Sequence, residues 1–364
     1  MDLFRLLAIY LPQFYPIPEN DQFWGKGFTE WTNVVKARKK FNGHYQPHLP
    51  ADLGFYDLRV PEVLFQQAEM AKKYGIYGFC FYHYWFSGKR ILEKPLDIYV
   101  DKKVDFPFCL CWANQDWTRT WSGNEGDILL KQQYSLEDDK QHIHYLAQKY
   151  FSQQNYIKVD GKPVFIIYRP ALFPDIKQTT DLWRSEIKKF GFKDLYLIHM
   201  ETDFYRINPD AIGFDAGVDF HPHSKNLPKR INNHWFNRRM NKHKLFRSPF
   251  VNNFVWDYAD YANKNKFTPP NDYLLYPSLF PMWDNSARKN RNAWIFLNSS
   301  PEAFSNWLKT ILKRFRPSDK QRNFIFINAW NEWAEGNHLE PCQKWGHEYL
   351  KAVKHLVTIN KNFK

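Results

Sequence analysis

The sequence predicts an α/β protein built as a single (β/α)8 TIM barrel with long loops after its first and sixth strands. Eight apolar, β-prone runs recur along the chain, and several helical patterns alternate with them. Strands that are apolar on both faces and alternate with helices form parallel sheets, and eight such units close a barrel. A chain of 364 residues can form one such barrel, so we expect one domain over residues 1–364.

Each expected strand ends in polar or aromatic residues. The strands are expected at residues 6–14, 76–84, 106–114, 163–170, 195–202, 216–223, 274–284 and 324–333. Helical patterns lie at residues 60–74, 136–151, 182–190, 301–315 and 343–356. Because parallel barrel strands all end on one face, the residues that close these runs should meet at a single rim, where barrel enzymes carry their active sites.

Two glutamates lie at the end of the last expected strand. The apolar run 324–327 leads into Glu332 and Glu335, which have Trp330 and Trp333 beside them. Carboxyl groups this close, walled by indole rings, can be held at different pKa values, so that one acts as an acid and the other as a base. Chemistry at glycosidic bonds needs that pairing. The alternative is an acidic first turn of a helix, which the flanking tryptophans and the preceding strand argue against.

Aromatic residues make up 19% of the chain, including 15 Trp, which is more than packing requires. Flat apolar rings suit the faces of sugars, so tryptophans at the rim are candidates for stacking on a glycan. Packing within the protein is the alternative for each of them. The candidates are Trp85, Trp112, Trp117 and Trp283.

Other rim residues offer hydrogen bonds or charge. Asn114, Asp116, Asp284 and Asn285 either bind sugar hydroxyls or cap the helices that follow them. Arg288 meets either a charged substituent of the substrate or a carboxylate at the surface. The remaining candidate substrate-binding residues are Tyr10, Glu30, Trp31, His83, Tyr84, Tyr168, His221, Trp330, Asn331 and Trp333.

The chain is basic, with 51 Lys and Arg against 38 Asp and Glu and a net charge of +13, which favours an anionic partner. Over half of this excess lies in residues 224–272, which contain ten basic residues, only three acidic ones and many aromatics. We expect this insertion to bind an anionic lipid-linked glycan or a membrane surface. Nucleic acid is a competing anionic partner that a steep salt dependence would reveal, and we do not expect it.

No cofactor or metal is expected. Gly25-Lys26-Gly27 is too short for a nucleotide-binding loop, and no Gly-x-Gly-x-x-Gly occurs. His221 and His223 alternate on one strand, but no acid completes a recognisable ligand spacing in the sequence. The amino terminus lacks a signal peptide and no apolar stretch could span a membrane, so we expect a cytoplasmic protein, peripheral at the inner membrane surface where the insertion binds lipid.

The sequence resembles the WbsX family of polysaccharide-biosynthesis proteins, which carry a domain similar to glycoside hydrolase family 99, the endo-α-1,2-mannosidase group. The matching segments are residues 8–14, 24–34, 43–58, 112–117, 283–285 and 327–341. The resemblance implies one family-99-like barrel and retention of stereochemistry. It implies that Glu332 removes the proton of the sugar's own 2-hydroxyl, which attacks the anomeric carbon to form a 1,2-anhydro sugar. Glu335 would then protonate the departing oxygen, although spacing alone leaves both role assignments open.

We therefore expect a carbohydrate-active enzyme that acts on glycosidic bonds in the biosynthesis or processing of surface polysaccharide, such as lipopolysaccharide O-antigen or capsule. Its substrate would be an oligosaccharide or polysaccharide. The family label says glycosyltransferase, whereas the residues favour a glycosidase or transglycosidase, because the helix-terminus signature that seats a sugar nucleotide is missing. Two alternatives remain: a catalytically inactive glycan-binding barrel, and an endo-α-mannosidase-like hydrolase of imported glycans.

Overall fold

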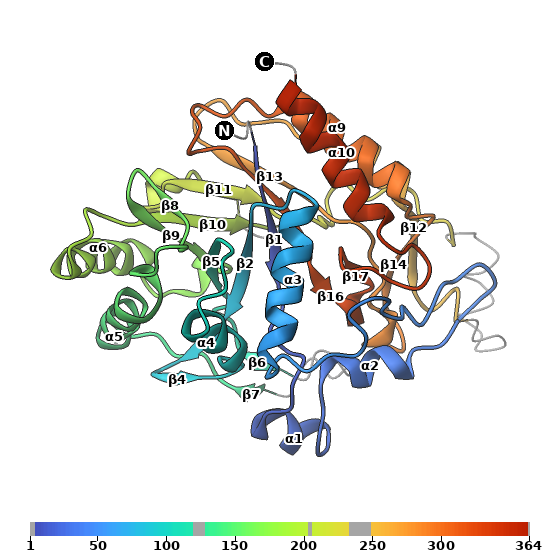
Figure 1. Ribbon diagram of the computed structural model, residues 1–364, viewed down its shortest axis with the longest axis horizontal. Coiled ribbons are helices and arrows are strands. Elements are labelled where there is room, and N and C mark those ends of the chain that lie inside the picture. Colours follow the sequence, from blue (N-terminus) through green and yellow to red (C-terminus); the bar gives the residue numbers. More distant parts are fainter. Residues whose placement is uncertain (1–3, 119–127, 203–205, 233–248, 363–364) are drawn as a thin grey trace.

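The computed structural model describes residues 4–118, 128–202, 206–232 and 249–362, and its centre is a closed barrel of eight parallel strands (Figure 1). Each strand pairs in parallel with its neighbour along the chain, and the pairing of the first strand with the last closes the ring. This arrangement confirms the predicted fold class. The barrel strands are β1 (Arg5–Tyr10), β2 (Gly78–His83), β5 (Phe108–Trp112), β9 (Lys162–Ile167), β10 (Tyr196–Glu201), β11 (Ala216–Asp219), β13 (Leu275–Leu279) and β15 (Phe324–Ile327).

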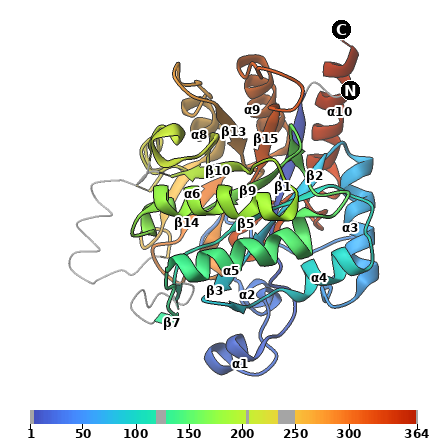
Figure 2. The same cartoon turned by 90° about the vertical axis from the view of Figure 1, so that its left-hand side faces the viewer.

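Helices cover the outside of the barrel, which explains why the strands are apolar on both faces. Every residue of β5 and β15 is buried. Neighbouring helices pack side by side, for example α5 against α6, as Figure 2 shows. Within the described ranges, no helix is both long enough and apolar enough to cross a bilayer. The outer helices are α3 (Pro61–Lys73), α4 (Lys94–Asp101), α5 (Leu136–Leu146), α6 (Ile176–Glu186), α8 (Tyr258–Lys264), α9 (Pro301–Arg314) and α10 (Glu348–Asn362).

Some helix boundaries differ from the expected ones. The helix expected at residues 182–190 begins earlier, because Asp175 accepts a hydrogen bond from the Gln178 backbone amide and so caps α6 at its amino end. Its expected last turn is a separate 3-10 helix, η4 (Ile187–Phe190). The final helix starts only after a tight turn in which the Gly346 amide donates to the Cys342 carbonyl. The short helices α4 and α8 were not predicted.

Both long loops lie where the sequence placed them. The loop after β1 contains α1 (Pro18–Trp24) and α2 (Glu30–Lys36), which lie at the end of the barrel opposite the two chain termini (Figure 1). The insertion at residues 224–272 contains α8 and β12 (Phe254–Asp257), which pairs in parallel with β14 (Trp294–Leu297) outside the barrel. Residues 233–248 of the insertion lie outside the described residues.

Candidate active site

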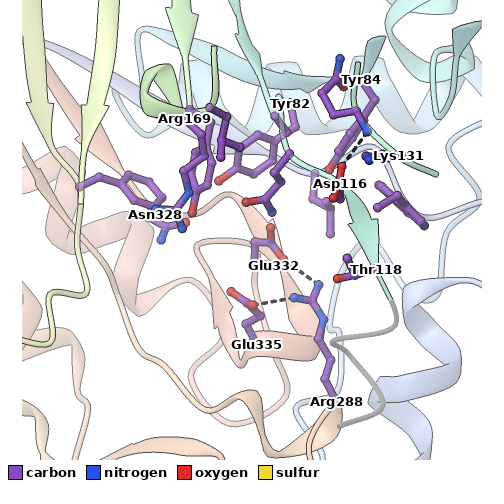
Figure 3. Close-up of a pocket in the computed structure, with 18 of the residues that line it drawn as sticks. Tyr82, Tyr84, Asp116, Thr118, Lys131, Arg169, Arg288, Asn328, Glu332 and Glu335 are labelled. Carbon is purple, nitrogen blue, oxygen red and sulfur yellow. Dashed lines mark hydrogen bonds and ion pairs between the residues drawn. The ribbon is translucent and has the colours of Figure 1, made fainter. Parts of the chain in front are cut away.

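A cavity of about 860 Å³ opens at the carboxyl ends of the barrel strands (Figure 3). Loops after most of the barrel strands contribute to its wall, so residues far apart in sequence meet there, as expected for a (β/α)8 fold. Both glutamates predicted as the acid–base pair line it. The other predicted residues in its wall are Tyr84, Asp116, Trp117, Tyr168, Trp283 and Arg288.

The loop after β15 carries Glu332 and Glu335 and is held on both sides. Asn331 anchors it to the end of β1, because its side chain accepts a hydrogen bond from the Leu11 amide (2.8 Å) and donates one to the Leu11 carbonyl (3.0 Å). On the other side, the backbone amide of Asp284 donates to the Glu335 carbonyl (2.7 Å). These bonds fix the backbone beneath both carboxyl groups. The loop comprises β16 (Asn331–Glu332), the 3-10 helix η7 (Trp333–Glu335) and β17 (Asn337–His338).

A third carboxyl group, that of Glu340, supports this loop from behind. It is buried and accepts hydrogen bonds from the Tyr56 hydroxyl (2.8 Å), the Gln67 amide (2.6 Å) and the Trp333 indole (2.6 Å). The Trp333 ring also stacks on His338, with 3.7 Å between ring centroids. Burial raises the pKa of Glu340 to about 7. Trp333 therefore helps to position, from within the protein, the loop that carries Glu332 and Glu335.

Arg288 joins three carboxyl groups at the edge of the cavity. Its Nη1 donates to Glu335 (2.6 Å) and its Nη2 to Glu332 (3.0 Å), as the dashed lines in Figure 3 show. Its Nε and Nη2 both donate to Glu30, at 3.1 and 2.9 Å. Glu30 is fully buried and belongs to α2 in the loop after β1. The ion pair offered as an alternative for Arg288 therefore exists, but its partners are two buried carboxylates, Glu30 and Glu332, and the partly exposed Glu335 that lines the cavity, and not groups at the surface.

The charge balance of this cluster controls the protonation of Glu332. Burial raises the pKa of Glu332 to about 8; Arg288 opposes this, while Glu335 and Glu30 add to it. Burial likewise raises the pKa of Glu30 against the effect of Arg288. Three carboxyl groups thus face one guanidinium, and Glu332 holds a proton up to the neutral range. A carboxyl group that gains and loses its proton near neutral pH suits general acid–base chemistry.

Strand parity explains why some of the predicted residues lie outside the cavity wall. Successive strand residues point to opposite faces, and the sequence analysis named members of both faces. In β2, Tyr82 lines the cavity, whereas the ring of His83 points away and lies 2.9 Å from His142 of α5. Trp112 is likewise fully buried away from the cavity, next to Trp183. The predicted residues absent from the wall are Tyr10, Glu30, Trp31, His83, Trp85, Trp112, Asn114, His221, Asp284, Asn285, Trp330, Asn331 and Trp333.

Several of these residues support the backbone around the site. Asp284 caps the 3-10 helix η6 (Asn285–Ala287) by accepting from the Ser286 amide (2.9 Å), and its other oxygen lies 2.6 Å from His44. Asn285 accepts from the Trp294 amide (2.8 Å). The capping alternative is therefore what the structure shows for Asp284.

The cavity wall also contains residues that the predictions omitted. Tyr82, Arg169 and Asn328 lie at or just beyond the carboxyl ends of β2, β9 and β15, within the predicted strand runs, so their positions were a usable signal. The residues on the long loop after β5 carry no periodic pattern that would have placed them. The omitted residues are Leu11, Tyr82, Ala113, Gln115, Thr118, Lys131, Gln132, Tyr134, Arg169, Leu172, Phe220 and Asn328.

Asp219, His221 and His223 form a cluster with metal-ligand spacing at the end of β11. The sequence analysis found no acid at such spacing, and this was wrong, because Asp219 supplies one. Asp219 already has a cationic partner, because Arg206 donates to it at 3.2 Å, and His223 lies 2.6 Å from the same oxygen. His221 also contacts the Tyr261 hydroxyl (2.8 Å). The residues fit a buried ion-pair network, and we derive no metal-dependent step from them.

Comparison with known structures defines the class of this barrel. It is similar to the GH99 endo-alpha-mannosidase from Bacteroides thetaiotaomicron, with a TM-score of 0.59 and 13% identity over 98% of both chains. It is also similar to a glycoside hydrolase-like protein, with a TM-score of 0.62 and 15% identity over 97% of this chain and 93% of the other. At such low identity the likeness shows a shared fold. The barrel is thus of the kind found in glycoside hydrolase family 99.

The chain belongs to the family described as Glycosyltransferase WbsX, which matches residues 6–353. This confirms the resemblance found in the sequence. Two curated relatives, both described as uncharacterized protein WxcX, come from Xanthomonas campestris pv. campestris, strains B100 and ATCC 33913. Each is 41% identical over 355 residues, or 97% of this chain and 49% of the relative. The chain therefore spans about half the length of these relatives.

Replacing Arg288 by Met should destabilise the protein by about 3–5 kcal/mol at neutral pH, because the change leaves buried carboxylates without their cation. This loss of stability should grow as the pH rises through 8, since Glu332 then ionises beside Arg288 in the wild-type protein and has no such cation in the variant. Urea unfolding at several pH values measures the free energy of unfolding.

Arg322→Met is the matched control, because Arg322 also pairs with two carboxylates, Asp160 and Asp319, but near the surface. It should cost less than about 1 kcal/mol. An Arg288→Met variant as stable as this control at every pH would contradict the role assigned to Arg288.

Proposed function

We propose that this protein is a carbohydrate-active enzyme that cleaves or transfers a glycosidic bond with retention during the biosynthesis or processing of surface polysaccharide. The observation that carries the proposal is the shared cavity position of Glu332 and Glu335 at the carboxyl ends of the barrel strands, with one arginine bonded to both. Membership of the WbsX family supports a biosynthetic role. The GH99-like fold supports an acid–base site on a barrel.

The site suits a reaction in which Glu332 is the base and Glu335 the acid. Burial makes Glu332 a stronger base than an exposed glutamate, while Arg288 favours its ionised form. Such a base can take the proton of a sugar 2-hydroxyl, as the family resemblance implies, and that oxygen then attacks the anomeric carbon. The leaving oxygen takes its proton from Glu335. Water or a second sugar hydroxyl then opens the 1,2-anhydro ring, giving its proton to Glu335 while Glu332 returns a proton to the 2-oxygen, and the result is hydrolysis or transfer respectively.

The aromatic wall supports a glycan as the substrate. Tyr84, Trp117, Tyr168 and Trp283 line the same cavity as the two glutamates, and their rings offer apolar faces to sugars. Asp116 also lines the wall and accepts a hydrogen bond from the Gln132 amide (2.7 Å), which fixes its orientation. A cavity of about 860 Å³ accommodates more than a single sugar ring.

Glu335→Gln should lower turnover by about 10²- to 10⁴-fold while glycan binding persists, because the amide cannot supply a proton. Glu332→Gln should have an effect of similar size, and Glu69→Gln, an exposed change on α3, should have none. Release or transfer of sugar from a panel of bacterial surface oligosaccharides is followed by mass spectrometry. Proton NMR of the first product reports its anomeric configuration. A protein that binds these glycans with no turnover in any form would instead be a glycan-binding barrel.

The pH dependence of kcat/KM should distinguish the roles of the two glutamates. The profile is measured in Glu335→Gln on an activated aryl glycoside, whose leaving group needs no acid, with circular dichroism to show that the fold persists across the range. A base must be ionised, so with Glu332 as the base the activity of this variant rises by about tenfold per pH unit below the Glu332 pKa and levels off near pH 8. With Glu332 as the acid, Glu335→Gln would have lost its base, and the activated glycoside would not restore turnover.

The basic insertion at residues 224–272 attaches the enzyme to an anionic lipid-linked glycan or to the inner membrane surface, on the cytoplasmic side. Its charge supports this, and the pair Arg238 and Arg239, which lies outside the described residues, offers a direct test. Reversing both to Glu should weaken cosedimentation with vesicles containing phosphatidylglycerol and leave turnover of free glycans unchanged. If the wild-type protein and the double variant cosedimented equally with these vesicles, the membrane role would be ruled out.

A further inference from the structure

We propose that Arg169 forms an anion-binding subsite inside the cavity, and that the glycan substrate carries a carboxylate there, as an acidic sugar does. The inference rests on the proposed function, because it concerns the substrate of the same cavity. Arg169 lines the wall at the end of β9. In Figure 3 it lies on the other side of Glu332 from Arg288.

The backbone of Arg169 is fixed by an asparagine from a neighbouring strand end. The side-chain amide of Asn114 donates to the backbone carbonyl of Arg169 (2.8 Å), and the backbone amide of Arg169 donates to the side-chain oxygen of Asn114 (2.7 Å). Asn114 is fully buried and is itself bonded to the Tyr134 hydroxyl (3.1 Å). Asn114 thus acts on the substrate through Arg169, as a positioning residue. A fixed backbone reduces the entropy lost when the side chain binds a ligand.

The side chain of Arg169 is anchored along one part and open along another. Its guanidinium lies over the ring of Tyr168, at 5.1 Å from the ring centroid, and Nη1 donates to the Thr202 hydroxyl (3.0 Å). Across the described part of the chain, no carboxylate pairs with Arg169. Arg288, in the same cavity, pairs with three. The two arginines therefore have different tasks: Arg288 holds the glutamates, and Arg169 has donors left for a ligand.

The geometry of the open donors favours a carboxylate. With Nη1 engaged by Thr202, the edge formed by Nε and Nη2 remains, and this edge matches the two oxygens of a carboxylate in a planar, two-bond pairing. A half-buried guanidinium that has no counter-ion among the described residues is also partly desolvated, so an arriving anion gains more there than at the surface. A neutral sugar hydroxyl would satisfy only one donor at a time.

Matched acidic and neutral glycans test the subsite. The probes are oligosaccharides of mannuronic, glucuronic and galacturonic acid, each paired with the same oligosaccharide after chemical reduction of its carboxyl groups. Binding is measured by calorimetry in the Glu335→Gln background, which keeps the glycan intact. At least one acidic probe should bind about 10- to 100-fold more tightly than its reduced partner. In Arg169→Gln that preference should disappear, and Arg169→Lys should keep only part of it.

Arg316→Gln is the matched control, because it removes the same charge from an exposed position beyond the end of α9. It should retain the full preference. A preference that survives Arg169→Gln, or reduced glycans that bind as well as acidic ones in all three series, would overturn the proposal. Sugar phosphates preferred over uronic acids through Arg169 would overturn the choice of carboxylate. If no glycan, acidic or neutral, bound or was turned over, the proposed function would be overturned as well. If only neutral glycans were turned over, the subsite proposal would fail and the proposed function would still hold.

Discussion

The interaction on which the site depends is the bonding of one buried guanidinium to three carboxyl groups. Arg288 follows β13, Glu30 lies in the loop after β1, and Glu332 and Glu335 lie in the loop after β15, so one side chain joins three segments that only the closed barrel brings together. Burying charge is costly unless each charge has its partner. The same bonds that hold these loops in place therefore also set the protonation of the groups that face the cavity.

Much of this arrangement follows from patterns in the sequence. The eight apolar runs predicted the barrel, and the rule that barrel strands end on one face predicted that Glu332, Glu335, Trp117 and Trp283 would share a cavity. Strand parity limited the rest, because a run such as Tyr82-His83 gives no sign of which residue faces inward when helices bury both faces. The partnership of Arg288 with Glu30 joins residues 258 positions apart. A contact between residues so far apart cannot be predicted from local sequence patterns.

Under the proposed function, the family name and the fold are compatible with one chemistry. A retaining barrel enzyme forms an activated sugar intermediate, and whether water or a hydroxyl opens it decides between hydrolysis and transfer. On this view a transferase in polysaccharide assembly needs no nucleotide-binding fold, because the donor sugar is activated within the site. If the proposed function holds, an acceptor that fills the aromatic cavity around Glu332 excludes water from it, which favours transfer over hydrolysis.

The residues around the cavity fall into two groups with different freedom to vary. Those bonded to the loop after β15, including Glu340 and its partners Tyr56 and Gln67, reach as far as the helical layer of α3, so a change in that outer layer is transmitted to the reacting groups. Lys131, Gln132 and Tyr134 line the cavity from the loop after β5. Divergence of related barrels towards new sugars can thus proceed on one wall while the reaction itself is inherited unchanged on the other.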